Sequence, residues 1–318
     1  MIYFLAFALA CSIVLVLIPP LKKFALRIGF VDKPRSDSSR KIHREPIPLT
    51  AGLAIFAAFS AVYLLFIRDS WQQTAAILGG GALVLAIGLV DDWFKTNGRE
   101  FPALPKFVVQ MSAAVLVYAS GIVFAGFENP VNGAYVVLPG WLSFLFTVLW
   151  IFGVTTVINF SDGMDGLAGG LSAISGGTLL VVALVMGQQG SAMMAVITVG
   201  VSIGYLFYNR PPAKVFMGDA GATYLGFMLG VVALDGAFKQ ATLLSLFIPI
   251  LAIGVPILDN LRVVVVRLLK GVPIYQADTS QVHYRLLATG MKPVQVVSFL
   301  YLLHVCFGLF SIVLLLAQ

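Results

Sequence analysis

The chain has 318 residues, of which 59% are hydrophobic and 11% charged, and its mean hydropathy is +0.97. This composition excludes a soluble enzyme, and apolar runs of about 17–20 residues predict several membrane-spanning helices. The formal charge of +6 does not indicate a nucleic-acid partner, because the basic residues follow a membrane topology. Cys11 and Cys306 both lie in apolar runs, which favours packing over a disulfide or a zinc site.

Along the chain, apolar runs predict an all-α integral membrane protein with about ten transmembrane helices in one domain, 1–318. No basic residue precedes the first run, so we expect a retained helix and not a cleaved signal peptide. The ninth span is expected to be long or broken, because Pro249 and Pro256 permit kinks. Segment 125–140 is expected to form a hairpin. The expected spans are 2–18, 49–67, 73–90, 104–124, 141–158, 167–187, 190–207, 220–235, 241–258 and 293–316.

Basic residues gather on one side of this predicted topology. They lie in the loops 19–48, 91–106, 208–219 and 259–292, and the only exceptions are Arg68 and Lys239. The positive-inside rule predicts that these loops are cytoplasmic, which places both termini on the outer side. The cytoplasmic face is then electropositive, as suits an anionic lipid or an anionic substrate.

Carboxylates occur at four span ends on the same predicted side. They are Asp91 and Asp92 after the third span, Asp162 and Asp165 before the sixth, Asp219 at the start of the eighth and Asp259 at the end of the ninth. An acid near membrane depth is costly, so such residues usually line a polar cavity or bind a ligand. The alternative for Asp162 and Asp219 is helix capping, for which Asp is a favourable residue.

The stretch NFSDGMDGLAGG at 159–170 is the most informative of the four. Asp162 and Asp165 are three residues apart, which would place them on nearly one face of a helix. The surrounding glycines permit close approach of backbone and ligand, and a helix N-terminus favours phosphate. Converging carboxylates require a cation, and oxygen ligands suit Mg²⁺. These features predict a cytoplasmic site for a metal and a phosphorylated substrate.

Three motifs in order then resemble a known family: VDDWF at 90–94, NFSDGMDGLAGG at 159–170 and NRPPAKVFMGDAG at 209–221. The chain looks like the polyprenyl-phosphate N-acetylhexosamine-1-phosphate transferases, which include MraY, WecA and TagO, and is closest to the WecA/TagO branch. The resemblance implies a bundle of about ten helices with its active site at the cytoplasmic face.

The implied reaction transfers N-acetylhexosamine-1-phosphate, with GlcNAc-1-phosphate expected, from a UDP-sugar to undecaprenyl or another polyprenyl phosphate, releasing UMP. The implied cofactor is Mg²⁺, with Mn²⁺ as the alternative. The expected location is a bacterial plasma membrane, where the product would begin a cell-wall or surface polysaccharide. Membrane lipids are expected partners, nucleic acid is not, and a homodimer is left open.

The resemblance also assigns roles to individual residues. Phe216 is expected to stack on uracil near Asp165, and Asp91 is a candidate base or phosphate organiser. The full set is catalytic Asp91, Asp92 and Asp162, metal-binding Asp219 and Asn159, and substrate-binding Asp165, Phe216, Asn209, His283 and Arg285.

Two segments depart from the family pattern. The last cytoplasmic loop usually carries HxHH followed by Arg, whereas this chain has QVHYRLL at 281–287, which keeps only His283 and Arg285. In the first loop PLTAG, at 48–52, replaces a Gly-Gly ending. Because the last loop shapes the sugar and diphosphate pocket in this family, a different UDP-sugar donor remains an alternative.

The sequence also bears on four other classes of membrane protein. A transporter is disfavoured because the acids gather at one face and no inverted repeat occurs. An intramembrane aspartyl protease requires G-x-G-D, where this chain has Phe216 in place of the first glycine. A CDP-alcohol phosphotransferase motif also begins with Asp-Gly, as DGMDG does, but this chain lacks the Ala-Arg and the later spaced aspartates of that motif. A non-catalytic paralogue is left open by the altered histidine motif.

Overall fold

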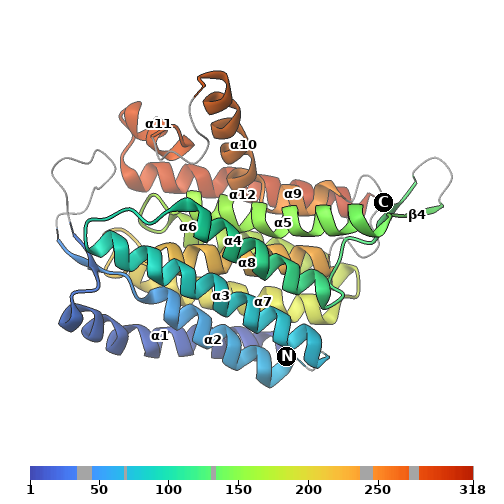
Figure 1. The fold of residues 1–318 in the computed structure, drawn as a ribbon, viewed down its shortest axis with the longest axis horizontal. Coiled ribbons are helices and arrows are strands. Elements are labelled where there is room, and N and C mark those ends of the chain that lie inside the picture. The colour runs from blue at the N-terminus through green and yellow to red at the C-terminus, as the bar shows by residue number, and fades with distance from the viewer. Residues whose placement is uncertain (34–44, 68–69, 130–133, 237–245, 272–278, 318) are drawn as a thin grey trace.

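The computed structural model describes residues 1–33, 45–67, 70–129, 134–236, 246–271 and 279–317. Within these ranges the chain forms twelve helices and two small two-stranded sheets, which confirms the all-α class (Figure 1). The helices are α1 (Ile2–Ile28), α2 (Ala51–Phe66), α3 (Trp71–Thr96), α4 (Ala103–Ala119), α5 (Gly140–Phe160), α6 (Leu167–Val185), α7 (Gln189–Asn209), α8 (Gly218–Gly236), α9 (Phe247–Ala252), α10 (Gly254–Leu269), α11 (Val282–Ala288) and α12 (Pro293–Leu316). The strands are β1 (Val31–Asp32), β2 (Ile47–Pro48), β3 (Gly126–Glu128) and β4 (Tyr135–Val137).

Among the described residues, six helices are long and apolar enough to cross a membrane: α1, α3, α5, α6, α7 and α12. Helices α2 and α4 are apolar but shorter. A polytopic membrane protein is therefore supported, and the number of about ten spans stays a prediction. Both termini lie toward the end of the bundle that carries β4 (Figure 1).

Two helix limits differ in an informative way from the apolar runs. Helix α1 continues ten residues past the expected span 2–18, to Ile28, and ends at Gly29 with φ 74°. Hydropathy predicts only the part of a helix that lies in lipid, so the expected span did not include the last turns of α1, which carry basic residues. The expected break in the ninth span is confirmed for the described residues, because Ile253 separates α9 from α10. Pro256 lies in the first turn of α10, where its missing N–H leaves no bond unmade.

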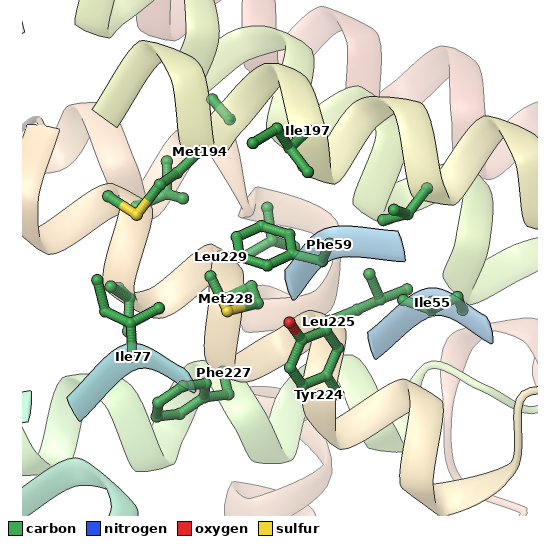
Figure 2. Close-up of a cluster of buried hydrophobic side chains, with 14 of the residues drawn as sticks. Ile55, Phe59, Ile77, Met194, Ile197, Tyr224, Leu225, Phe227, Met228 and Leu229 are labelled. Carbon is green, nitrogen blue, oxygen red and sulfur yellow. The ribbon is translucent and has the colours of Figure 1, made fainter. Parts of the chain in front are cut away.

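Helix α8 is the centre of the bundle. Every residue from Ala220 to Leu234 is buried, which is typical of a helix that is apolar on all faces. Figure 2 shows Tyr224 and Phe227 of α8 packed among side chains of α2, α3 and α7. Small residues permit the close approach of α2 to α8, since a Cβ at Gly52 would lie only 2.7 Å from the backbone nitrogen of Gly221.

Helix α10 projects away from the bundle, and its base is held by α12 (Figure 1). His304 of α12 accepts a hydrogen bond from the Val255 backbone N–H at 3.4 Å, and its other ring nitrogen lies 2.8 Å from Ser175 Oγ of α6. Ser311 of α12 donates to the carbonyl oxygen of Ile248 in α9 at 2.8 Å. These bonds fix both sides of the break, so the direction of α10 is set by α12. The expected hairpin at 125–140 is confirmed by the antiparallel pairing of β3 with β4.

Candidate active site

The acid pair at the end of α3 has two different environments. Asp91 and Asp92 are both 1% exposed. Asp92 accepts hydrogen bonds from the backbone N–H groups of Asp219 at 2.9 Å and Ala220 at 3.1 Å, so it satisfies the first turn of α8. This approach requires glycine at 218, which has φ 66°, and a Cβ there would overlap the Asp92 carboxylate. Asp92 therefore orients the N-terminus of α8.

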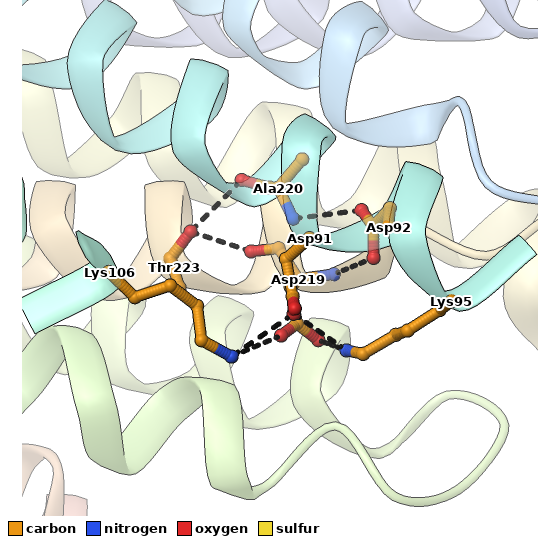
Figure 3. A network of polar contacts seen from close by, with 7 residues as sticks. All are labelled: Asp91, Asp92, Lys95, Lys106, Asp219, Ala220 and Thr223. Atoms are coloured by element: carbon orange, nitrogen blue, oxygen red, sulfur yellow. Dashed lines mark hydrogen bonds and ion pairs between the residues drawn. The ribbon is translucent and has the colours of Figure 1, made fainter. Parts of the chain in front are cut away.

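Asp91 faces the opposite way, into a charged network with Asp219 and two lysines (Figure 3). Lys95 Nζ lies 3.0 Å from Asp91 Oδ2 and 2.5 Å from Asp219 Oδ1. Lys106 Nζ, from α4, lies 3.2 Å from Asp91 Oδ2 and 3.9 Å from Asp219 Oδ2. The two ammonium groups offset the charge of two carboxylates that come from α3 and α8.

Sequence reasoning missed both lysines, because it counted them only as loop charges. The available signal was the four-residue spacing of Asp91 and Lys95 on one helix. The side chain of Lys95 is 45% exposed, that of Lys106 28% and that of Asp219 20%. These charges can therefore meet a ligand, whereas Asp91 is buried beneath them.

The loop 161–166 carries Asp162 and Asp165, and it is not helical. Helix α6 starts at Leu167 after Gly166, so neither aspartate caps it and the expected common helix face does not form. Burial, followed by the negative charge of Asp219, raises the pKa of the Asp162 carboxyl to about 7. Asp162 is thus electrostatically linked to the acid that begins α8.

Asp165 and Asn209 join this loop to the segment before α8. Asp165 Oδ2 accepts from the Ala213 backbone N–H at 2.9 Å. Asn209, which is 2% exposed, accepts from the Gly166 N–H at 2.8 Å and donates to the Val215 carbonyl at 3.0 Å. The two polar groups of Asn209 therefore join the loop 161–166 to the segment before α8. The sequence motif alone did not reveal this positioning role.

Phe216 lies in the second of these loops and is partly exposed. Its backbone N–H donates to the Pro48 carbonyl at 2.8 Å, and its carbonyl accepts from the Ala51 N–H at 3.2 Å. These bonds tie the residues before α8 to β2 and to the start of α2. The backbone of Phe216 is therefore fixed three residues before Asp219.

Helix α11 places His283 against the acidic loop. Asp259 Oδ1 accepts from the Val282 N–H at 2.9 Å, and Arg262 Nη1 donates to the Ser280 carbonyl at 2.9 Å, so α10 holds the start of α11. His283 is 2% exposed and packs so closely on Gly163 that a Cβ there would overlap the imidazole. Burial lowers the pKa of His283 to about 4, so the ring is neutral at pH 7. Arg285, on the same helix, is exposed.

The donor set fits a hard divalent cation. The Oδ1 atom of Asn159 is buried and has no hydrogen-bond partner among the described residues, which is costly unless a ligand satisfies it. Asp219 supplies a partly exposed carboxylate. Among the described residues no group of three His, Cys, Asp or Glu side chains is arranged to hold a metal. Mg²⁺ does not need such a group, because it usually takes one or two carboxylates and completes its shell with water and phosphate.

Comparison with known proteins identifies the family. The family model described as glycosyl transferase family 4 matches residues 74–237, a range that contains the whole Asp91–Asp219–lysine network. The chain is 36% identical over 309 residues to a Bacillus subtilis (strain 168) protein named "Probable undecaprenyl-phosphate N-acetylglucosaminyl 1-phosphate transferase", a match that covers 97% of this chain and 84% of the relative.

Two further relatives carry different names. "Decaprenyl-phosphate N-acetylglucosaminephosphotransferase" of Mycobacterium tuberculosis (strain ATCC 25618 / H37Rv) is 32% identical over 311 residues, covering 89% of this chain and 75% of the relative. "Phospho-N-acetylmuramoyl-pentapeptide-transferase" of Chlamydia trachomatis serovar D is 33% identical over 283 residues, covering 82% of this chain and 81% of the relative. Given these matches and the order of its acidic motifs, the chain belongs to glycosyl transferase family 4.

Proposed function

We propose that this chain transfers GlcNAc-1-phosphate from UDP-GlcNAc to undecaprenyl phosphate or a related polyprenyl phosphate, releasing UMP. An oxygen of the lipid phosphate attacks the phosphorus that bears the sugar. A new P–O bond forms there, the bond to UMP breaks, and UMP leaves with the electron pair. The supporting observation is the network of Asp91, Lys95, Lys106 and Asp219, in a chain whose relatives are named as such transferases.

The network suits this reaction because two anions must approach each other. Phosphoryl transfer depends mainly on positioning and charge neutralisation. The ammonium groups of Lys95 and Lys106 are partly exposed and can donate hydrogen bonds to phosphate oxygens in place of the carboxylates. Asp91 then lies behind them as the group that orients the lipid phosphate or takes its proton. Phe216 is proposed to stack on uracil.

The metal in this proposal is Mg²⁺, with Mn²⁺ as a substitute, held by Asp219 and Asn159. When bound, it supplies positive charge to the diphosphate oxygens. A cation bound at Asp219 would favour the ionised form of Asp162, whose pKa is raised to about 7 by burial and by the charge of Asp219. The unpartnered Asn159 Oδ1 supports this assignment.

The proposed location is a bacterial plasma membrane with the site on the cytoplasmic side. The supporting feature is the excess of Lys and Arg in the loops at that end of the helices. UDP-sugars are cytoplasmic, so donor supply and topology agree. The product would begin a cell-wall or surface polymer.

The decisive experiment measures UMP release by the purified full-length chain with undecaprenyl phosphate. UDP-GlcNAc, UDP-GalNAc and UDP-glucose are compared, each with and without lipid and Mg²⁺. We expect release with UDP-GlcNAc that requires both. Faster release with another donor would assign the altered QVHYR segment to a different sugar. No release from folded protein with any donor would contradict the proposal and favour a non-catalytic paralogue.

A further inference from the structure

A groove runs between the last turns of α7 and the first turns of α12, on the outside of the bundle. Its volume is about 350 Å³, and a second hollow of about 410 Å³ adjoins it at the C-terminal end of α7. The two share Phe207, Arg210 and Pro211. The apolar lining of the groove consists of Ile203, Leu206, Phe207, Val294, Val297 and Tyr301.

The groove faces the lipid. Both α7 and α12 are long and apolar enough to span a membrane. Phe207 is 60% exposed and Val294 57%, so each wall presents an apolar side chain outward. A soluble protein would bury such side chains, whereas at membrane depth they contact hydrocarbon. The walls therefore suit an acyl chain.

The mouth of the groove is basic. Arg210 and Lys214 are exposed and line the adjoining hollow, and neither forms an ion pair with a residue that the structure describes. The Arg210 guanidinium carbon lies 5.8 Å from the centre of the Phe207 ring, which directs it along the apolar wall. The neighbouring carboxylate of Asp165 is engaged by the Ala213 N–H. Basic pockets between membrane helices bind anionic lipid headgroups.

The floor of the groove connects to the candidate active site. The Tyr301 hydroxyl donates to the Gly166 carbonyl at 2.5 Å, and the Gly166 N–H donates to Asn209. Gly166 ends the loop that carries Asp162. A ligand that fills the groove would therefore hold Tyr301 and this loop in place.

We propose that this groove binds one anionic glycerophospholipid, with its phosphate on Arg210 and Lys214 and an acyl chain between α7 and α12. We place the lipid acceptor elsewhere, because in the proposed reaction its phosphate reaches Lys95 and Lys106 on α3 and α4, and the ion pairs of these lysines with described residues are to Asp91 and Asp219. Binding here stabilises the acidic loop through Tyr301. The choice of occupant rests on the proposed function, but lipid binding at this groove can be measured without the transfer reaction.

The test uses the full-length chain in phosphatidylcholine nanodiscs with increasing fractions of phosphatidylglycerol, and native mass spectrometry to count retained phosphatidylglycerol. The Arg210→Gln/Lys214→Gln variant should lose roughly thirtyfold in apparent affinity, as expected when two basic contacts are removed. Val294→Trp should also lose retention, because the indole fills the groove while both charges remain. The matched control is Lys23→Gln/Arg27→Gln, which removes two exposed charges from α1 and should retain the lipid as wild type does.

Three results would overturn the proposal. Wild-type retention in the Arg210→Gln/Lys214→Gln variant would show that the groove holds no lipid phosphate. Equal losses in both double variants would show general attraction to a basic surface. Displacement of phosphatidylglycerol by undecaprenyl phosphate, with the same residues controlling both, would assign the groove to the acceptor. Failure of UMP release with intact lipid retention would reject only the proposed reaction.

Discussion

The carboxylate of Asp92 on α3 accepts a hydrogen bond from the backbone N–H of Asp219 on α8 at 2.9 Å. An acid near the C-terminal end of α3 thus fixes the position of an acid in the first turn of α8. Asp91, next to Asp92, faces the side chain of Asp219 through two shared lysines. Neighbouring aspartates therefore divide two tasks, and their substitution should separate stability from activity.

Asp92→Asn should destabilise the protein by about 1–3 kcal/mol. The amide NH₂ of asparagine is itself a donor, so it cannot accept a hydrogen bond from the backbone N–H group of α8 that it faces. Thermal unfolding in detergent, followed by near-UV circular dichroism, measures the change. Asp91→Asn is the matched control, since it removes the same charge from the neighbouring residue while both backbone bonds from α8 to Asp92 remain. Equal stabilities of the two variants would contradict the capping role.

Asp219→Asn should lower UMP release by roughly a hundredfold or more, because the side chain is the proposed metal ligand and partner of Lys95. The backbone N–H that bonds to Asp92 remains, so the thermal midpoint should stay near that of wild type. Steady-state assays across a range of Mg²⁺ concentrations provide the measurement. Activity close to wild type at every concentration would remove Asp219 from the site.

Lys95→Gln should lower kcat by roughly tenfold or more, because the transferred charge loses a positioned cation. Lys95→Arg should recover part of this loss by keeping the charge. The control is Lys23→Gln, which removes an exposed lysine from α1 and should leave kcat unchanged. If Lys95→Gln behaved like this control, the network would be structural only.

His283→Gln should reduce the sensitivity of the protein to acid. The folded-state pKa of His283 is about 4, below its usual value near 6.5, because the ring is buried. Between these values the unfolded chain binds a proton that the folded chain does not, so stability falls as pH decreases. From pH 7 to pH 5 the free energy of unfolding should fall by about 2 kcal/mol through this histidine, and the His283→Gln variant should not show this decrease. Parallel decreases of the thermal midpoint in both proteins would contradict the burial of a neutral ring.

Phe216→Ala should raise KM for the UDP-sugar by about tenfold, the range expected when a base loses an aromatic stacking partner. KM for the lipid acceptor should not change, and Phe216→Tyr should restore donor binding. Initial-rate kinetics with each substrate varied in turn separate the two constants. A change confined to the lipid KM would place Phe216 elsewhere in the site.

Local pattern in the chain was sufficient for the class of protein and for much of its candidate site. Apolar runs predicted the helices, because burial in hydrocarbon requires a continuous apolar surface whatever the packing. Acidic residues at span ends predicted where a polar site lies, since unpaired carboxylates are costly at that depth. The break near Pro256 was also readable, because proline restricts its own backbone.

Only the tertiary structure decided how these residues are used. Asp92 meets the backbone of Ala220 across a sequence separation of 128 residues, and Asn209 meets Gly166 across 43. Lys106 joins Asp91 from a different helix. No local period encodes such pairings, because they depend on how α8 packs between α2, α3 and α7. Composition and spacing determined which residues are present at the membrane end, and packing determined which of them face a ligand and which hold the others in place.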